Sequence, residues 1–357
     1  MWGVGSAFVA QQYNNTHTPP PSTPITPSFP INLLSLNLQG FSDLKMDALI
    51  NIASVERAHV ICLQETWCRG VGGLIGTRDF FVARCDCAVL ERRRGVAIYI
   101  RRSIVMPGTV PCVRFADGGD GRVLVLDFIA VDGSSLSVAS VYFPAASDAE
   151  KRLFVSSLPW HHLRGALVGC DSNLCITLCD KFPQRPSDSL SSAALLLRAK
   201  LVAFGLIDAF ELLCDDDWRP LTCKPLGDRR GSCIDRFFVP SALTALTASV
   251  DVLPFVFGDH DCVRLRVAGR APVPQLERRL PPTPTSILKN NTHLHDSIKQ
   301  FAKIANNKLN SGELSSDAAW SSFVIRTRRA ITNETSKQHA VIVRRKLSTT
   351  HAETCVV

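Results

Sequence analysis

The sequence predicts an α/β fold in which packed β-sheets form the centre and helices lie outside. The chain has 357 residues, of which 46% are hydrophobic and 20% charged. This composition supports one core of about 200–250 residues, or two smaller ones. Many strand-like segments follow one another directly, with few helical patterns between them, which favours packed sheets. A doubly wound parallel sheet would need a regular alternation of strands and helices, and that alternation is absent.

The strands are predicted from short apolar, β-branched runs bounded by Gly, Pro, Asp or Ser. Their lengths of three to ten residues suit strands that are buried on both faces. The predicted strands are Ile31–Leu36, Val60–Leu63, Gly95–Ile100, Arg122–Val131, Leu136–Val141, Ala166–Val168, Ile234–Val239 and Cys262–Val267.

Three segments have helical spacing instead. Apolar residues recur with a 3.6-residue period from Leu44 to Val55, after Ser42, which is a suitable N-cap. Ser147–Leu158 and Ser192–Phe204 show similar spacing. We therefore expect a helix between the first two strands and two more helices in the middle of the chain.

Composition divides the chain into three parts. Residues 1–30 carry no charge and contain a Pro-, Thr- and Ser-rich stretch, which predicts a disordered leader. Residues 31–268 form the predicted domain, and the body from 31 to 270 is nearly neutral. Residues 269–357 begin with a Pro-rich break and then hold nearly all the excess basic charge, so we expect a basic, partly helical extension. Such an extension is either a solvated segment or a site of attraction for a polyanion.

Several classes of protein are excluded by composition. The hydrophobicity is too high for a mostly disordered chain, and no apolar run of 18 residues could cross a membrane. Met1–Ala10 has no basic segment and is a poor signal peptide. The 13 cysteines are scattered without C-x-x-C pairs, which indicates reduced thiols. We expect a nuclear or cytoplasmic protein that is not secreted.

Polar residues recur just past the ends of the predicted strands, where a rigid sheet can hold several side chains around one crevice. Glu, Asp and Asn are hard oxygen ligands suited to Mg²⁺ or Mn²⁺. A His beside an Asp can give a hydrogen bond or a proton to a phosphoryl group. Together they fit metal-assisted hydrolysis of a phosphodiester or phosphomonoester. These residues are Asn37, Glu65, Tyr142, Asp171, Asn173, Asp235, Asp259 and His260.

Competing signatures are weak. No phosphate-binding loop, dinucleotide fingerprint, zinc-protease motif or nucleophile elbow occurs. Cys170, Cys175 and Cys179 with the His161–His162 pair are possible zinc ligands, but their spacing fits no common finger, so structural thiols are favoured. The acidic run 215–217 is either a solvated loop or a polymerase-like pair, and no palm-sized domain surrounds it.

Seven blocks together resemble the endonuclease/exonuclease/phosphatase superfamily, which includes DNase I, apurinic endonucleases and inositol polyphosphate phosphatases. The resemblance covers residues 31–268, and it is nearest to the apurinic-type endonuclease domain of LINE-type (non-LTR) retrotransposons. The blocks are Leu36-Asn37-Leu38-Gln39-Gly40, Leu63-Gln64-Glu65-Thr66-Trp67, Arg94-Gly95-Val96-Ala97, Val141-Tyr142-Phe143-Pro144, Asp171-Ser172-Asn173, Ser232-Cys233-Ile234-Asp235 and Gly258-Asp259-His260.

The resemblance implies a four-layer sandwich of two packed, mostly antiparallel β-sheets flanked by helices, as in DNase I. It also implies roles for individual residues. Glu65, Asn37 and Asp259 would form the metal set. Asp171, Asn173, Asp235, His260 and Tyr142 would be catalytic, with Asp171 activating water and Asp235 holding His260. Thr222 and Ser232 would contact the substrate backbone.

The implied activity is a Mg²⁺-dependent DNA endonuclease that nicks one strand, leaves 3′-hydroxyl and 5′-phosphate ends and serves target-primed retrotransposition. DNA is the expected partner, and element RNA is a second partner for the basic extension. The 87 residues after Arg270 are too few for a reverse transcriptase, so we expect a truncated element or a fragment. The alternatives are an inositol-polyphosphate phosphatase or other phosphodiesterase of this fold, and an impaired nucleic-acid-binding remnant.

Four departures from the superfamily pattern bear on activity. An extra residue, Cys170, precedes Asp171, and Ser172 stands where an aromatic side chain is usual; either change could shift the end of that strand. Cys233 replaces a usual Arg, which removes a cation. Gly258 replaces a usual Ser.

Overall fold

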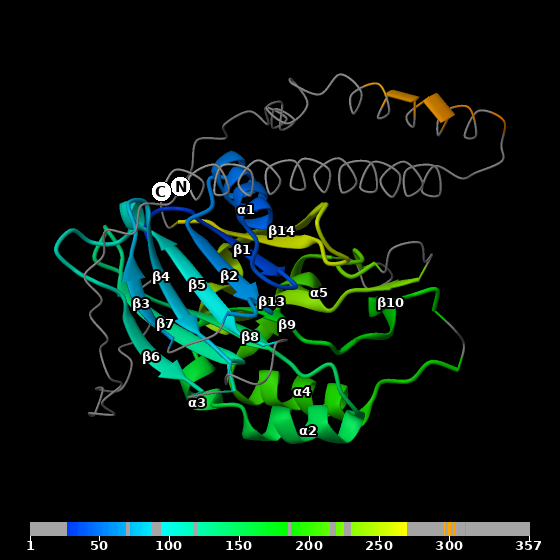
Figure 1. The fold of residues 1–357 in the computed structure, drawn as a ribbon. Coiled ribbons are helices and arrows are strands. Elements are labelled where there is room, and N and C mark those ends of the chain that lie inside the picture. The colour runs from blue at the N-terminus through cyan, green and yellow to red at the C-terminus, as the bar shows by residue number, and fades with distance from the viewer. Residues whose placement is uncertain are drawn as a thin grey trace, which may run out of the picture. The chain divides into compact units, whose positions relative to one another are not determined.

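The computed structural model describes residues 27–68, 72–87, 94–117, 120–184, 187–214, 219–224 and 230–269, with isolated positions between 296 and 311. The chain divides into two compact units, Met1–Arg279 and Leu280–Val357. The fold below is that of the first unit, drawn in colour in Figure 1. The predicted leader, apart from residues 27–30, and nearly all of the predicted basic extension lie outside the described residues.

One central sheet has seven strands, and only its β1–β2 pair is parallel. Helix α1 (Asp43–Val55) covers its outer face through Leu49 and Ala53, and the hydroxyl of Ser42 caps it by accepting from the Lys45 amide. In spatial order the strands are β14 (Thr247–Leu253), β15 (Cys262–Val267), β1 (Ile31–Asn37), β2 (Val60–Gln64), β5 (Val96–Arg101), β4 (Phe80–Cys85) and β3 (Gly73–Gly76).

The other central sheet has six strands, and only its β8–β9 pair is parallel. Helices α2 (Asp148–Ser157), α3 (Trp160–Leu163) and α4 (Ser192–Ala203) lie along its outer face, as Figure 1 shows. In spatial order the strands are β11 (Leu206–Asp208), β13 (Asp235–Pro240), β9 (Leu167–Asp171), β8 (Ser135–Tyr142), β7 (Val123–Ile129) and β6 (Cys112–Ala116).

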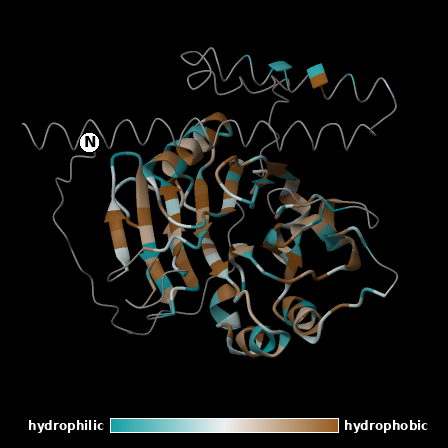
Figure 2. Cartoon of the chain, turned by 45° about the vertical axis from the view of Figure 1, so that its right-hand side comes forward, coloured by the Kyte–Doolittle hydropathy of each residue, from teal (hydrophilic) through white to brown (hydrophobic). Residues whose placement is uncertain are grey.

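The two sheets pack face to face on a common core. Leu33 of β1 lies in this inner core, whereas Leu34 packs outward against helix α1, as the two-residue period of a strand requires. Leu126 of β7 and Val138 of β8 lie in the same inner core and belong to the second sheet. Because both faces of the central strands are buried, these strands are mostly apolar, and brown is the prevailing colour along them in Figure 2. The predicted α/β sandwich of two mostly antiparallel sheets flanked by helices is confirmed.

All eight predicted strands and all three predicted helices are present, with ends that differ by a few residues. The sequence missed β3, β4, β6, β11 and β14, which lie mostly at or near sheet edges. Short elements complete the described fold: helix α5 (Ala209–Leu213), the two-stranded sheet of β10 (Lys181–Phe182) and β12 (Gly231–Ser232), and 3₁₀ turns at Arg102–Ile104, Leu178–Asp180 and Ser241–Leu246. Among the described residues, no helix has the length and apolar character needed to span a membrane.

Candidate active site

Strand pairing brings the predicted polar residues to one end of the two sheets. In the first sheet the parallel register sets Asn37 opposite Gln64, the last residues of β1 and β2. In the second sheet Tyr142 pairs with Asp171 at the end of β8 and β9, and β13 places Asp235 opposite Asp171. Residues more than a hundred positions apart therefore meet because their strands end at the same edge.

Asn37 connects the two sheets. Its Nδ2 donates to Oε1 of Glu65 at 3.0 Å and to Oδ2 of Asp171 at 2.8 Å. Its Oδ1 accepts from the backbone N–H of Gln39 at 3.1 Å, which fixes the orientation of the amide because a backbone N–H can only donate. The amide oxygen is thus turned toward the backbone. Asn37 thus orients two carboxylates, and its role as a metal ligand stays a prediction.

Asp171 is fully buried at the end of β9. Its Oδ1 accepts from the Asn173 amide at 2.9 Å, and its Oδ2 accepts from Asn173 Nδ2 at 3.2 Å as well as from Asn37. Burial, and then the charge of Asp235, raise the pKa of Asp171 to about 7, against the opposing effects of His260 and the amide donors. A carboxyl group of this kind can exchange a proton near neutral pH.

His260 is paired with Asp235. The imidazole Nδ1 lies 2.9 and 3.0 Å from the two carboxylate oxygens of Asp235, and His260 is only 6% exposed. Burial lowers the pKa of His260, but the charge of Asp235 and its hydrogen bond more than compensate and hold that pKa well above its usual value. With Nδ1 on Asp235, Nε2 is the nitrogen that remains for another partner, and it lies 3.8 Å from Oδ1 of Asp259.

Thr222 occupies a position that differs from the predicted substrate contact, whereas the role of Ser232 stays a prediction. Thr222 is fully buried, and its hydroxyl accepts from the backbone amides of Ile234 at 3.0 Å and Asp235 at 2.9 Å. Ser232 lies in β12 and exchanges backbone hydrogen bonds with Cys223. Thr222 therefore holds the start of β13, and with it Asp235, and its buried hydroxyl is not available to a substrate.

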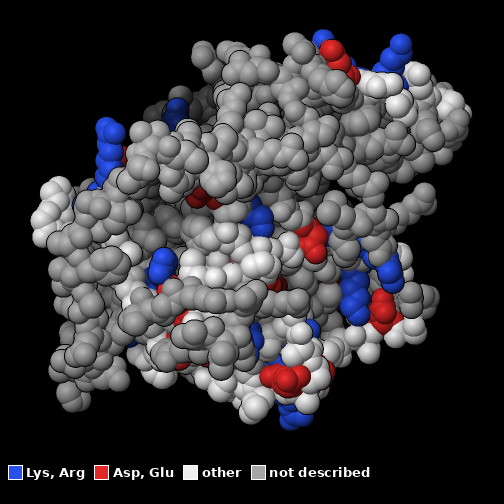
Figure 3. All heavy atoms as spheres, viewed as in Figure 1, with Lys and Arg blue, Asp and Glu red and all other residues white. Residues whose placement is uncertain are grey.

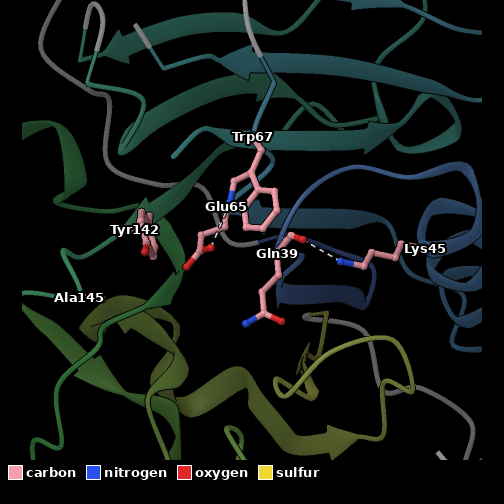
Figure 4. Close-up of a pocket in the computed structure, with 6 residues that line it drawn as sticks. All are labelled: Gln39, Lys45, Glu65, Trp67, Tyr142 and Ala145. Atoms are coloured by element: carbon pink, nitrogen blue, oxygen red, sulfur yellow. Dashed lines mark hydrogen bonds between the residues drawn. The ribbon is translucent and has the colours of Figure 1, made fainter. Parts of the chain in front are cut away.

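A pocket of about 460 Å³ opens beside these residues. Oε2 of Glu65 accepts from the Trp67 indole at 3.1 Å, and Tyr142 also hydrogen-bonds to Glu65. Lys45, from helix α1, donates to the carbonyl groups of Leu38 at 2.8 Å and Gln39 at 2.7 Å. Figure 4 shows the lining residues, which are Gln39, Lys45, Glu65, Trp67, Tyr142 and Ala145.

The sequence did not single out Gln39, Lys45 or Trp67 as site residues. Gln39 and Trp67 belong to the first two resemblance blocks, so their place beside Asn37 and Glu65 was a usable signal. Gln39 also donates to Oδ1 of Asp259 at 2.6 Å, which ties the first block to the last. Lys45 had no signal, because its contacts are to backbone carbonyl groups at the start of the helix.

Among the described residues, two groups of side chains are close enough to hold a cation. Asp171, Asp235 and His260 form one group, and Cys223, Asp259 and His260 form the other; in each, the possible ligand atoms lie within 4.8 Å of one another. Glu65 belongs to neither group and lies at the wall of the pocket.

The departures from the superfamily pattern leave the strand ends in register. Asp171 is still the last residue of β9, and Ser172 is buried, with its hydroxyl donating to the Ile234 carbonyl at 2.7 Å. Three residues after Cys233 the chain carries a buried cation, Arg236. The fully buried guanidinium of Arg236 donates to the Cys233 carbonyl and forms ion pairs with Asp208 and, at 3.0 Å, with Asp180.

A two-sheet α/β sandwich that gathers carboxylates and a carboxylate-backed His at one edge defines a class of hydrolytic nucleases and phosphatases. The sequence profile of the Endonuclease/Exonuclease/phosphatase family matches residues 34–260, and the chain belongs to this family. The superfamily resemblance read from the sequence is thereby confirmed. A search of curated proteins found no match.

Solved structures show the same fold at low sequence identity. The chain is similar to the AP endonuclease LMAP of Leishmania major, with 17% identity and a TM-score of 0.55 over 68% of this chain and 88% of that one. It is similar to the APE2 catalytic domain of Xenopus laevis, with 16% identity and a TM-score of 0.51 over 68% and 94%. The endonuclease domain of TRAS1, a telomere-specific non-LTR retrotransposon, aligns with 15% identity and a TM-score of 0.47 over 68% and 100%.

Proposed function

We propose that the protein is a Mg²⁺-dependent endonuclease that nicks one strand of DNA by phosphodiester hydrolysis and leaves 3′-hydroxyl and 5′-phosphate ends. One observation carries the proposal. Asn37 joins Glu65 to Asp171, and Asp171 pairs across the strands with the Asp235 that holds His260. This hydrolysis needs three kinds of group: a carboxylate that binds a cation, a carboxyl group with a pKa near neutral pH, and an imidazole held by a second carboxylate.

The residues fit a divalent metal at Glu65. Mg²⁺ is usually held by one or two carboxylates and keeps several waters or substrate oxygens. Glu65 offers one carboxylate at the wall of an open pocket, and its two oxygens are steadied by Asn37 and Trp67. When bound there, the metal would neutralise charge that develops on the phosphate. Asp259 is the second carboxylate of the predicted metal set. Its side chain is 31% exposed, and its Oδ1 accepts a hydrogen bond from Gln39.

The protein's own groups divide the proton chemistry. Asp171 would orient the attacking water and accept its proton, and the Asn173 amide groups hold that carboxylate in place. His260 would donate from Nε2 to the phosphoryl oxygen, with Nδ1 kept on Asp235. Tyr142, hydrogen-bonded to Glu65, would support the same phosphate.

Several lines support DNA as the substrate. The sequence blocks resemble LINE-type endonucleases, and two of the similar structures are named as AP endonucleases or their relatives. On the face shown in Figure 3, basic and acidic side chains of the described residues are interspersed, in keeping with the nearly neutral body. DNA affinity that is sensitive to salt is therefore assigned to the basic extension, which would also take element RNA. A reduced nuclear or cytoplasmic compartment suits this role.

The test is nicking of supercoiled plasmid in Mg²⁺, with the new ends mapped. Glu65→Ala and His260→Ala should each lower the rate by about 10²–10⁴-fold, because each removes a group that acts on the reacting phosphate. Asp79→Ala and His161→Ala are matched controls, since both residues are exposed and lie outside the site. Unimpaired nicking by either site variant would refute the assignment.

Two other outcomes would each select an alternative. Release of phosphate from inositol polyphosphates without nicking would assign a phosphatase of this fold. DNA retention with a steep salt dependence, and no cleavage with any divalent metal, would indicate an impaired nucleic-acid-binding protein.

A further inference from the structure

We propose that Cys223, Asp259 and His260 form a second cation site, which takes Zn²⁺, and that its occupation stops the hydrolysis proposed above. The cation binding stands on the geometry of these three residues alone. Only the inhibition rests on the proposed function.

The three side chains already lie close together before any ion is bound. The thiol sulfur, a carboxylate oxygen and an imidazole nitrogen lie within 4.8 Å of one another, and Oδ1 of Asp259 is 3.8 Å from Nε2 of His260. Ligands at the usual Zn–N, Zn–O and Zn–S distances of about 2.0–2.3 Å lie roughly 3.3–3.8 Å apart in a tetrahedron. A contraction of at most about 1.5 Å would bring the atoms into place.

Two of the three ligands are already held by other side chains. Asp235 holds Nδ1 of His260, which leaves Nε2 for the metal; this carboxylate–His–metal arrangement is common around zinc. Gln39 holds the Asp259 carboxylate at 2.6 Å. A proposed zinc site therefore has both its imidazole and its carboxylate oriented by other side chains.

The backbone that carries the ligands is fixed on both sides. Cys223 exchanges two 2.9 Å hydrogen bonds with Ser232. On the other side, the Lys224 amide donates to the Asp259 carbonyl at 2.7 Å, and the Asp261 amide donates to the Thr222 carbonyl at 2.7 Å. Cys223 thus forms isolated β-bridges with Ser232 on one side and with His260 on the other.

The type of ligand separates this site from the one at Glu65. A thiolate is a soft ligand that favours Zn²⁺ over Mg²⁺, whereas Glu65 offers only oxygen. Zinc on Nε2 of His260 would occupy the nitrogen that the proposed mechanism directs at the phosphate, because Nδ1 is committed to Asp235. The predicted consequence is inhibition that additional Mg²⁺ does not relieve.

The binding test uses the full-length protein with Zn²⁺ or Co²⁺ alone, and needs no nuclease activity. Calorimetry should show a Zn²⁺ site that Cys223→Ser weakens at least tenfold. Co²⁺ should give a thiolate-to-metal absorption band that Cys223→Ser and Cys223→Ala both remove. Cys112→Ser is the matched control, because Cys112 is exposed on β6, and it should retain the site and the band. Unchanged Zn²⁺ affinity and an unchanged Co²⁺ band in both Cys223 variants would overturn the proposal.

The inhibition test measures plasmid nicking in saturating Mg²⁺ as Zn²⁺ is added. The unaltered protein and Cys112→Ser should be inhibited alike, and Cys223→Ser should need at least ten times more Zn²⁺. Equal inhibition of Cys223→Ser, or inhibition that additional Mg²⁺ removes, would place the ion at Glu65 and refute the inhibitory role. Zinc binding that depends on Cys223 in a protein that nicks under no condition would uphold the cation site and refute the endonuclease assignment.

Discussion

Thr222→Val should destabilise the protein even though it preserves the shape of the side chain. The hydroxyl accepts from the Ile234 and Asp235 amides in a site with 0% exposure, so valine would leave two buried donors without an acceptor. Each unsatisfied buried donor costs about 1–3 kcal/mol, which gives roughly 2–6 kcal/mol in total. That is a large fraction of the stability of a typical domain, about 5–15 kcal/mol.

The assay is urea unfolding, with Thr222→Ser as the matched control. Serine keeps the hydroxyl and loses one methyl group, so it should cost only about 0.5–1.5 kcal/mol. In nicking assays Thr222→Val should lower kcat with little change in KM, because the residue positions Asp235 and does not reach substrate. Equal unfolding midpoints for the valine and serine variants would show that the hydroxyl does not stabilise the two amides. A rise in KM alone would support the predicted contact between Thr222 and the substrate.

Three further predictions concern buried charges. In the metal-free protein, the carboxyl carbon of Asp171 should titrate near pH 7 by NMR, and Asp171→Asn should remove this signal. The folded state should lose stability as pH rises from about 4 to 7, because it binds the proton more tightly than the unfolded chain does. A titration near pH 4 would contradict the effect of burial on Asp171. Asp235→Asn should lower the pKa of His260, since the carboxylate charge now raises it, so an unchanged imidazole titration would show that the pair does not interact. Arg236→Met should cost about 3–5 kcal/mol in thermal or urea unfolding because it leaves two buried carboxylates without their cation, whereas an exposed control, Arg57→Met, should change stability little.

The strands that could be predicted are those with both faces buried. Val60–Gln64 is buried at every position, and its first four residues, Val60–Leu63, form an uninterrupted apolar run. Thr247–Leu253 is an edge strand and is only half-buried, and its polar residues hid it from the same criterion. Cys112–Ala116, at the edge of the other sheet, was missed for the same reason. Burial on both faces, more than β propensity, made these strands predictable from the sequence.

The site could be predicted as a set of residues but not as a set of contacts. The blocks named Glu65, Asp171 and His260 without showing which groups join them. The contacts depend on side-chain orientation. Asn37 turns its N–H groups, and not its oxygen, toward the carboxylates. Thr222 turns its hydroxyl inward to the backbone. Sequence spacing carries no information about either choice, because both follow from the donors and acceptors that the fold places nearby.

The backbone after these strands explains why the polar residues gather so closely. Gln39, Glu65, Trp67 and Asn173 have positive φ angles of 50°, 49°, 54° and 45°, and each follows within three residues of a strand end. A left-handed conformation costs a residue with a side chain about 1–2 kcal/mol. Hydrogen bonds across the ends of β1 and β2 oppose that cost, from Gly40 to the Glu65 carbonyl at 2.8 Å and from Leu38 to the Gln64 carbonyl at 2.9 Å. Strain concentrated beside a pocket is typical of a site whose geometry is held for chemistry, since an edge without such a role could relax to ordinary turns.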